Sequence, residues 1–549
     1  NLILQEPENV AEESTSFISS VNTTTTTTST SSLSTSSDSS NTNKYSIVIL
    51  ILCFFIAALS ALDRVAMSIA VLPLSSEYHL TETIKGQISS AFSFGYALSI
   101  IPVGLIVATA SPRIIMALGV FLWSVGTILT PWATNYISSS STMLDSAAST
   151  ADLFLFTGVL PILIMRAIIG GAEAIVLPTI QRFLANWIPA GQKSVAIATI
   201  FAGFQTGTIL AYIISPLVID SFGGWREMFY TYGGIGIVAL GPWLLFAKDS
   251  PDTDSSSGTI TIPKDIDMDT LDDSEAVECK ITITDIPTDD KSFLLDCSTD
   301  ATVELSPFQE NLNTNVEMNT AKDKMMDIIE SAPWKKFLTS PGVYAMTIAH
   351  AANNWGLYNN LSWTPTFYAE QYGLNVKESA LLSLIPSVAG AFGGYFSAIV
   401  ADSLIRRQTN AAVTANGTAM IDTTNIRKVF QGIALLGPSI CLALLSSRIP
   451  ESPSTAQLLL TGTVGLQAFN AAGYGAATQE KAGEKWSGLL YSITTLPGVL
   501  FGTMGVYLTG QILDSTDNNW SLVFGCNAGI DVVGALAFLL LYDAKREFD

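Results

Sequence analysis

Two pairs of charged residues lie inside apolar stretches of the sequence, where charge is costly. Asp63 and Arg64 interrupt the apolar run of residues 45–72, and Arg166 and Glu173 lie in a second run at residues 153–177. A charge near the middle of a membrane helix costs about 2.5–3.5 kcal/mol on insertion scales, so such residues usually face a polar cavity or a charged partner. We interpret these four residues as candidates for solute or ion binding. An ion network that only locks helices together is the alternative.

The spacing within each pair indicates contacts between helices rather than within one helix. Neighbouring helical residues point about 100° apart, so Asp63 and Arg64 cannot simply neutralise each other. Arg166 and Glu173 share a helix face but are separated by about 10 Å along the axis. The small residues between them allow close approach of another helix. We therefore expect the two pairs to meet.

Four other polar residues in apolar segments are weaker candidates. His350 is the only histidine within such a segment, and an imidazole can gain or lose a proton near neutral pH. Asn354 and Gln205 could donate hydrogen bonds to an anion, and Tyr96 could line a cavity. For each of these residues, packing or bridging between helices is the alternative interpretation.

The sequence lacks the motifs of enzymes and of ATP-driven pumps. It contains no GxSxG elbow, no phosphate-binding loop with its lysine and no HExxH motif. Its five cysteines form no CxxC or Cys/His spacing, so we predict neither a metal site nor a cofactor. We expect no enzymatic activity, and we expect no nucleic-acid partner because the sequence has no basic footprint.

Composition indicates a membrane protein of many spans. Only 13% of the 549 residues are charged, and the mean hydropathy is +0.40. Residues 249–332 carry 21 acidic and five basic side chains, and residues 1–43 carry five acidic and no basic ones, which together account for the net charge of −21. The acidity therefore belongs to two polar segments and says nothing about a transported species.

The apolar segments predict an all-α membrane protein with 12 transmembrane helices in two six-helix bundles. We expect a disordered Ser/Thr-rich tail at 1–44, a first bundle at 45–247, an acidic linker at 248–334, a second bundle at 335–543 and a short tail at 544–549. The predicted spans are 45–72, 84–107, 112–132, 153–177, 193–219, 227–247, 340–367, 376–401, 428–447, 456–478, 487–512 and 521–542. Two bundles of this kind are typical of transporters whose site lies between them, near the midplane of the membrane.

The basic residues favour one topology. With both termini and the linker on one side, that side receives 15 basic residues outside the linker, and the other side receives four: Lys85, Arg226, Lys377 and Arg448. The positive-inside rule then places the termini in the cytosol or its topological equivalent. In this topology a cytosolic turn carries Glu480, Lys481, Glu484 and Lys485, for which we predict solvated side chains.

Several of these runs resemble the anion:cation symporter family of the major facilitator superfamily. That family includes sialin, the vesicular glutamate transporters, bacterial galactonate transporters, and plant phosphate and ascorbate transporters. The plant branch is the most similar, and the likeness covers both six-helix halves. The runs that carry it are Leu62-Asp63-Arg64-Val65-Ala66-Met67-Ser68-Ile69-Ala70, Arg166 to Glu173 with Pro178, Gln205-Thr206-Gly207-Thr208, His350 to Trp355, and Trp363-Thr364-Pro365-Thr366.

The resemblance implies a role for each candidate. Arg64 is expected to bind the substrate anion, with Gln205, Tyr96 and Asn354 as further contacts. Asp63 and Glu173 are expected to carry coupling protons. Arg166 would then organise Glu173, and His350 matches the histidine of sialin-like members.

Two runs depart from the family pattern. The loop Ala108-Thr109-Ala110-Ser111-Pro112-Arg113 lacks the usual acid of the superfamily gating motif, although its counterpart in the second half keeps Asp402 with Arg406 and Arg407. Ala477-Thr478-Gln479-Glu480 stands where relatives carry an Asn-His-x-Asp run.

Together these observations predict a secondary active transporter of an organic or inorganic anion, such as phosphate, ascorbate, glutamate or a sugar acid. We expect coupling to a proton or sodium gradient by alternating access, in a monomer embedded in the lipid bilayer. The membrane is the plasma membrane or that of an organelle such as a plastid, vacuole or lysosome. The alternative is a membrane sensor that transports nothing and signals through the acidic linker.

Overall fold

The computed structural model describes residues 35–137, 158–188, 193–249, 331–414, 423–482 and 486–548. It divides into two units, Asn1–Ile47 and Val48–Asp549, and the account below concerns the second. Residues 250–330 of the predicted acidic linker and residues 1–34 of the predicted N-terminal tail lie outside the described residues. The first helix begins at Thr35, earlier than the predicted start at Tyr45, so the last part of the predicted tail is helical.

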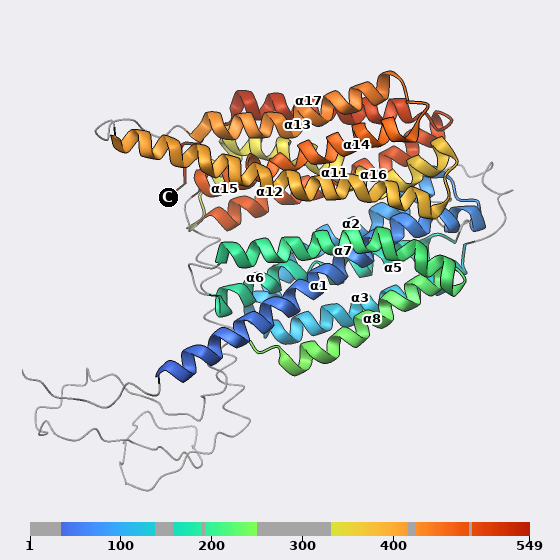
Figure 1. Cartoon of the computed structure of the whole chain (residues 1–549), viewed down its shortest axis with the longest axis horizontal. Coiled ribbons are helices and arrows are strands. Elements are labelled where there is room, and N and C mark those ends of the chain that lie inside the picture. Colours follow the sequence, from blue (N-terminus) through green and yellow to red (C-terminus); the bar gives the residue numbers. More distant parts are fainter. Residues whose placement is uncertain are drawn as a thin grey trace, which may run out of the picture. The chain divides into compact units, whose positions relative to one another are not determined.

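The described part of the chain is helical and contains no strand beyond one isolated bridge, Ala482 to Phe548. The N-terminal half comprises α1 (Thr35–Tyr78), α2 (Glu82–Thr109), α3 (Pro112–Thr134), α5 (Leu160–Glu173), α6 (Val176–Trp187), α7 (Lys193–Phe222) and α8 (Trp225–Phe246). The C-terminal half comprises α10 (Trp334–Thr339), α11 (Pro341–Tyr372), α12 (Val376–Thr414), α13 (Thr423–Ser447), α14 (Pro453–Gln467), η4 (Ala468–Ala471), α15 (Tyr474–Lys481), α16 (Ser487–Ser515) and α17 (Trp520–Leu541). Figure 1 shows the two halves as separate groups of helices.

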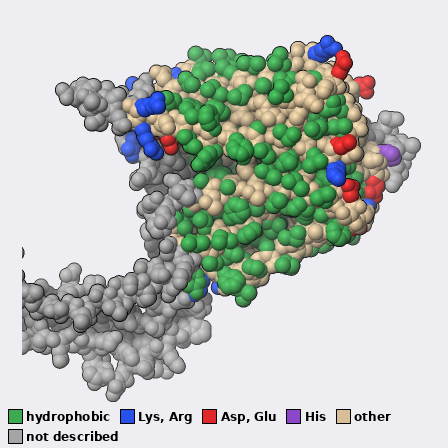
Figure 2. Space-filling view, in the orientation of Figure 1, with side chains coloured by type: hydrophobic (Ala, Val, Ile, Leu, Met, Phe, Trp, Pro, Cys, Tyr) green, Lys and Arg blue, Asp and Glu red, His purple; other side chains and the backbone are tan. Residues whose placement is uncertain are grey.

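The predicted all-α membrane fold is confirmed, and within the described residues each predicted span overlaps a helix or an interrupted helix. Nine spans within the described residues are long and apolar enough to cross a membrane. The other three predicted spans correspond to α2, α11 and the segment from α14 to α15. Large apolar side chains such as Leu98, Val238 and Leu540 are exposed. Apolar side chains cover much of the face shown in Figure 2, as expected for a surface in contact with lipid.

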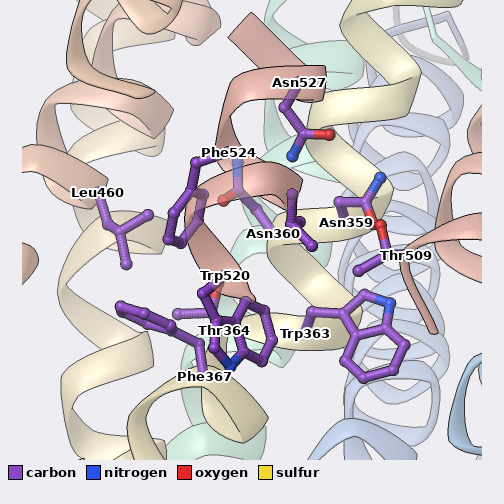
Figure 3. A pocket seen from close by; sticks show the side chains of 11 residues that line it. Asn359, Asn360, Trp363, Thr364, Phe367, Leu460, Thr509, Trp520, Phe524 and Asn527 are labelled. Carbon is purple, nitrogen blue, oxygen red and sulfur yellow. Dashed lines mark hydrogen bonds between the residues drawn. The ribbon is translucent and has the colours of Figure 1, made fainter. Parts of the chain in front are cut away.

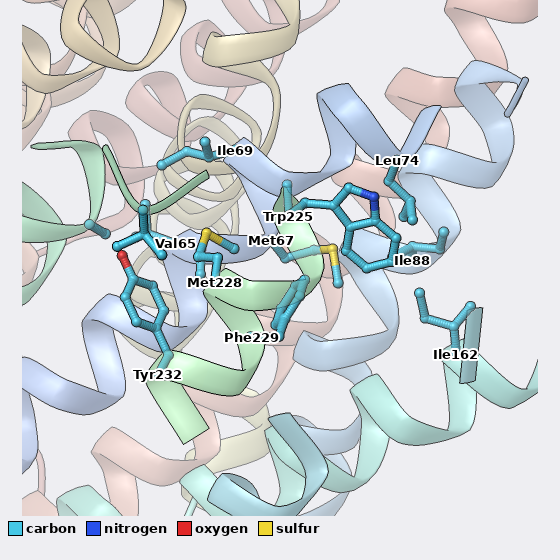
Figure 4. Close-up of a cluster of buried hydrophobic side chains, with 14 of the residues drawn as sticks. Val65, Met67, Ile69, Leu74, Ile88, Ile162, Trp225, Met228, Phe229 and Tyr232 are labelled. Atoms are coloured by element: carbon cyan, nitrogen blue, oxygen red, sulfur yellow. The ribbon is translucent and has the colours of Figure 1, made fainter. Parts of the chain in front are cut away.

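Each half has its own apolar core. In the N-terminal half, buried residues of α1 and α2 pack against α8, and Met67, Trp225 and Phe229 lie together there (Figure 4). This packing surrounds the stretch of α1 that carries Asp63 and Arg64. The charged pair is therefore held on a helix whose neighbouring residues are fixed by close packing.

The fourth span breaks where its acidic residue lies. Helix α5 ends at Glu173 and α6 begins at Val176. Pro178 explains the break, because it has no amide hydrogen to donate to the carbonyl of Ala174 and its ring clashes with that carbonyl. The tenth span is interrupted in the corresponding part of the other half, where Gly473 separates η4 from α15. Interrupted helices at matching positions of two repeats indicate a binding site between the repeats.

Close contact between helices positions the fourth span. A Cβ atom built on Gly170 would lie 1.9 Å from the carbonyl oxygen of Phe92, so only glycine permits this approach of α5 to α2. The same crossing fixes Gly95 against the backbone of Ala167. Small residues therefore hold Phe92 and the Arg166–Glu173 segment in direct contact.

The predicted solvated turn is wrong at Glu480 and Lys481, and Glu484 and Lys485 lie outside the described residues. Lys481 is fully buried and forms ion pairs with Asp543 and Glu547, and Glu480 pairs with Arg427 at 2.6 Å. The main chain of the C-terminal tail lies beside this lysine, because the Glu547 amide donates to the Lys481 carbonyl. The tail supplies carboxylates that the sequence pattern did not connect with this lysine, so the turn is a packed contact rather than a solvated surface.

Candidate functional site

A cavity of about 420 Å³ lies between the two halves. Its N-terminal wall comes from α1, α2, α5, α6 and α7, and its C-terminal wall comes from α11, α12 and α14. A volume of this size is within the range of small-molecule sites. The charged and polar residues that line it are Ser60, Arg64, Ser68, Ser89, Ser93, Tyr96, Arg166, Glu173, Gln205, Thr208, Tyr358, Ser362 and Ser387.

Arg64 and Glu173 form the charged centre of this cavity. Arg64 Nη2 lies 3.4 Å from Glu173 Oε2, and the same oxygen accepts a hydrogen bond of 2.8 Å from the Ser60 hydroxyl. The Glu173 side chain is fully buried, whereas the Arg64 side chain is 31% exposed. The expected meeting of the two charged pairs is thus observed for these two residues. In the described part of the chain, the bond to Glu173 engages one of the five N–H groups of the guanidinium, and the partly exposed side chain has others to offer.

Aromatic rings orient both arginines. The Arg64 guanidinium carbon lies 5.1 Å from the ring centre of Phe92 and 5.3 Å from that of Tyr96. The Arg166 guanidinium carbon lies 5.0 Å from the same Phe92 ring. Cation–π contacts of this kind stabilise a guanidinium without neutralising its charge. Both arginines are therefore held in place, and of the two it is Arg64 whose side chain is partly exposed to the cavity, whereas Arg166 is buried.

Asp63 lies outside the cavity lining. Its carboxylate accepts a hydrogen bond of 2.8 Å from the Thr127 hydroxyl of α3, and the residue is buried. Arg166 and Arg64 are the cations within electrostatic reach of this carboxylate. The two acids thus differ in their access to the cavity. Glu173 lines it, whereas Asp63 is not among the lining residues and bonds to α3 instead.

The weaker candidates divide into two groups. Gln205 and Tyr96 line the cavity with Arg64, as expected. His350 and Asn354 are buried against α16 instead, and a Cβ atom built on Gly498 would lie 2.3 Å from the His350 ring and 3.0 Å from the Asn354 amide. The His350 ring also packs edge-on against Tyr474 at 4.4 Å between ring centres. Neither His350 nor Asn354 is among the residues that line the cavity.

Sequence reasoning missed Tyr358. This residue of α11 lines the same cavity as Arg64, from the opposite half of the protein. Tyr358 lies about one helical turn after Trp355, the last residue of the polar segment that begins at His350. This spacing was the available signal that Tyr358 shares a helix face with Trp355. Its phenol adds a hydrogen-bond donor from the C-terminal half to the charges of the N-terminal half.

A second, much smaller pocket lies within the C-terminal half (Figure 3). Its volume is about 20 Å³, which is room for about one water molecule. Asn359, Asn360, Trp363 and Asn527 are among its lining residues. The pocket is too small for a solute and does not connect the candidate residues named above.

The loop that lacks the gating acid is completed by a distant residue. Asp249, which follows α8, accepts a hydrogen bond of 2.7 Å from the Arg113 amide and another from the Ser111 hydroxyl. A carboxylate therefore occupies this loop although the loop has none of its own. Among the described residues, no group of three or more His, Cys, Asp or Glu side chains could hold a metal ion.

The sequence model of the Major Facilitator Superfamily matches residues 53–494 of this chain. Similar proteins include the chloroplast sodium-dependent phosphate transport protein 1 of Arabidopsis thaliana, which is 29% identical and aligns over 91% of this chain and 80% of its own length. The chloroplast ascorbate transporter of the same plant is 28% identical over 91% of this chain and 76% of its own length.

Solved structures share the fold. An inward-facing bacterial homologue of the lysosomal transporter Spinster aligns with a TM-score of 0.60 and 15% identity, over 90% of this chain and 97% of that protein. A D-xylose–proton symporter aligns with a TM-score of 0.58 and 14% identity, over 92% of this chain and all of its own length. With the family match over most of the chain and two six-helix halves around a charged central cavity, the protein belongs to the major facilitator superfamily.

Proposed function

We propose that the protein is a secondary active transporter of an organic or inorganic anion, coupled to a proton or sodium gradient by alternating access. The observation that carries this proposal is the partly exposed Arg64 guanidinium in the cavity between the halves. A fixed guanidinium can replace the hydration of a phosphate or carboxylate with paired hydrogen bonds. The similar plant proteins are named for phosphate, ascorbate or anion transport, which supports the same substrate class.

Competition for Arg64 gives a mechanism of coupling. An anion that binds Arg64 competes with Glu173, whose Oε2 lies 3.4 Å from the guanidinium. Glu173 is fully buried, so a carboxylate released from its cation is stabilised by taking a proton. Anion binding at Arg64 and proton binding at Glu173 then favour each other, as symport requires. Asp63, shielded from the cavity and bonded to Thr127, serves as the second proton site.

Transport then requires that the two halves rock about the cavity. Arg64, Gln205 and Tyr96 hold the anion from the N-terminal half, and Tyr358 closes on it from the C-terminal half. We place Asn354 and His350 behind this wall, where they act on the cavity through the packing of α11 against α16. One chain supplies both walls, so we propose that a monomer suffices.

The basic residues and the plant relatives indicate a membrane and an orientation. The relatives are chloroplast proteins, so we propose a plastid membrane. With both termini and the linker on one side, that side carries 15 basic residues outside the linker and the other side carries four. The positive-inside rule assigns the first side to the cytosol or its topological equivalent.

Uptake into proteoliposomes tests the proposal. Radiolabelled phosphate, ascorbate, glutamate, sialate and galactonate are offered separately under an imposed pH gradient, an imposed sodium gradient and neither. We expect saturable uptake of at least one anion that is accelerated by one of the two gradients. If uptake of every anion in every condition equals uptake by liposomes without protein, the transport proposal is wrong and the sensor alternative is favoured.

A further inference from the structure

A second charged cluster joins the two halves far from the cavity, at the end of the protein where α1 ends and α2 begins. We call this the distal end, and the opposite end, where α8 ends and α10 begins, the linker end. Lys85 of α2 is buried, and its ammonium lies 2.5 Å from Glu82 Oε1 and 2.7 Å from Glu370 Oε1. Glu370 belongs to α11, so this contact crosses from the N-terminal to the C-terminal half.

The cluster has one cation for two carboxylates. The two carboxylates, Glu82 and Glu370, are close enough to interact electrostatically with each other, and both interact with the Lys85 ammonium. The second oxygen of each carboxylate, Oε2, is buried and has no hydrogen-bond partner in the described part of the chain. A buried carboxylate oxygen without a donor is costly, and two close carboxylates repel each other. One proton placed between them would remove both penalties.

Helix α16 closes the same end. Asp514 accepts hydrogen bonds from the amides of Glu82 and Thr83, at 2.8 and 2.6 Å, so a residue of the C-terminal half caps the first turn of α2. A Cβ atom built on Gly510 would lie 2.3 Å from the Glu82 carbonyl oxygen. The two helices therefore touch with no space between them, and the carboxylate of Asp514 is engaged by these amides rather than by Lys85.

The linker end is held differently. Its ion pairs among the described residues, Arg427 with Glu480 and Lys481 with Asp543 and Glu547, each stay within the C-terminal half. Arg113 and Asp249 likewise both belong to the N-terminal half. The described conformation is thus tied across the halves at the distal end, and opening that end requires the contacts of Lys85 and Asp514 to break.

We propose that Glu82, Lys85 and Glu370 form a proton-binding latch, which takes its proton from the compartment at the distal end and holds that end closed. The proposal rests on the alternating access proposed above. Separation of the halves moves Glu370 away from Glu82. Each carboxylate is then hydrated and no longer repelled by the other, so a shared proton no longer stabilises the pair. The proton therefore binds the closed form more tightly, and acid in the distal compartment favours closure.

Labelling of a cysteine from the distal side tests the latch. Ser89 lines the cavity on α2, and Ser89→Cys in the full-length protein in liposomes reports access to it. A membrane-impermeant thiol reagent is added on the distal side, and the labelling of the parent protein is subtracted. We expect acidification of the distal side to slow labelling by about tenfold, within the range typical of coupled sites. We expect Lys85→Met to raise the labelling rate by a similar factor.

Glu370→Gln is the decisive variant, because its amide is neutral like a protonated carboxyl. We expect it to give slow labelling that no longer responds to distal pH. Arg448→Met, which removes an exposed ion pair within one half, is the matched control and should keep the parent response. If Glu370→Gln keeps the full pH response, or if Lys85→Met leaves labelling unchanged, the latch is ruled out. No anion is needed for this assay, so its failure is distinct from failure of the transport proposal.

Discussion

At the residue scale, Arg64 has one partner inside the protein, Glu173, and we propose that an anion in the cavity is its second. It contacts Glu173 at 3.4 Å and leaves 31% of its side-chain surface exposed. The aromatic faces of Phe92 and Tyr96 hold the guanidinium without satisfying its N–H groups. This arrangement allows an incoming anion to exchange places with a carboxylate at little cost in reorganisation.

Glu173→Gln should separate transport from its driving gradient. The amide cannot be ionised, so anion binding at Arg64 no longer changes the protonation of residue 173. We expect counterflow exchange of the anion to persist while the acceleration by an imposed pH gradient is lost. Both are measured in proteoliposomes with the substrate identified by the uptake screen. Unchanged acid-driven uptake in this variant would remove Glu173 from the coupling step.

Thr127→Val should destabilise the protein without touching the cavity. Thr127 donates to Asp63 at 2.8 Å, and valine leaves that buried carboxylate oxygen without a donor. The expected loss is about 1–3 kcal/mol in the free energy of unfolding, seen as a lower midpoint of thermal unfolding in detergent. Thr206→Val is the control, because the hydroxyl of Thr206 bonds only to the Ala202 carbonyl of its own helix. Equal midpoints for the two variants would contradict the role given to Thr127.

The sequence was sufficient to identify the charged residues as site candidates, but it did not predict all of their contacts. Charges in apolar runs are visible by eye, and small neighbours correctly suggested that Arg64 and Glu173 meet. Tyr358 was missed because a tyrosine in an apolar helix has many uses, and only the packing of the two halves brings it to the same cavity as Arg64. Asn354 and His350 illustrate the converse, since polarity alone could not say whether they face the cavity or α16.

At the scale of elements, the broken fourth span and the crossing of α2 with α5 position the site. Glu173 is the last residue of α5, so its carboxylate lies where the backbone leaves the helical path. Pro178 made this break predictable in principle, although the span was expected to be continuous. The acid supplied by Asp249 to the Ser111–Arg113 loop was not predictable, because the two segments are far apart in sequence.

Gly170→Ala should loosen this crossing. The added methyl would lie 1.9 Å from the Phe92 carbonyl oxygen, so α5 must move away from α2. Overpacking of this kind costs about 1–3 kcal/mol, which exceeds the gain of about 1 kcal/mol that alanine brings to a helix. Gly234→Ala is the matched control, since a Cβ atom there meets nothing within 4 Å. Thermal unfolding in detergent should show a lower midpoint for the first variant only. A midpoint for Gly170→Ala at or above that of Gly234→Ala would contradict the close contact.

At the scale of the whole molecule, the relevant features are the two helical halves and the packing of their polar ends. Hydropathy and the distribution of basic residues predicted twelve spans in two groups because lipid imposes length and polarity on every helix. They could not predict which polar ends are packed. Lys481 was predicted to be part of a solvated turn, yet it is fully buried and pairs with carboxylates of the C-terminal tail.

Lys481→Met should weaken the linker end of the C-terminal half. The lysine is buried between Asp543 and Glu547, and its loss leaves two carboxylates without their shared cation. We expect a loss of about 3 kcal/mol in stability, at the low end for a broken buried pair because both carboxylates are partly exposed. Lys377→Met, at an exposed position, should leave the thermal midpoint unchanged. If the two variants unfold at the same temperature, the tail is not held by this lysine.

Deletion of residues 255–325 separates the carrier from the sensor. The deleted residues lie in the acidic linker, and the described residues that line the cavity all belong to the two helical halves. A carrier should keep gradient-driven uptake, because both walls of its site remain. Loss of uptake in a well-folded deletion variant would show that the linker is required, and would favour the sensor alternative or a regulatory role.

The most direct measurement compares Arg64→Ala with Arg448→Ala in proteoliposomes of equal protein content. Uptake of the identified anion and its protection of the purified protein against thermal unfolding are both recorded. We expect Arg64→Ala to abolish both while the protein stays folded, and Arg448→Ala, an exposed residue at the distal end, to retain both. Normal uptake and normal protection without the Arg64 guanidinium would contradict the account.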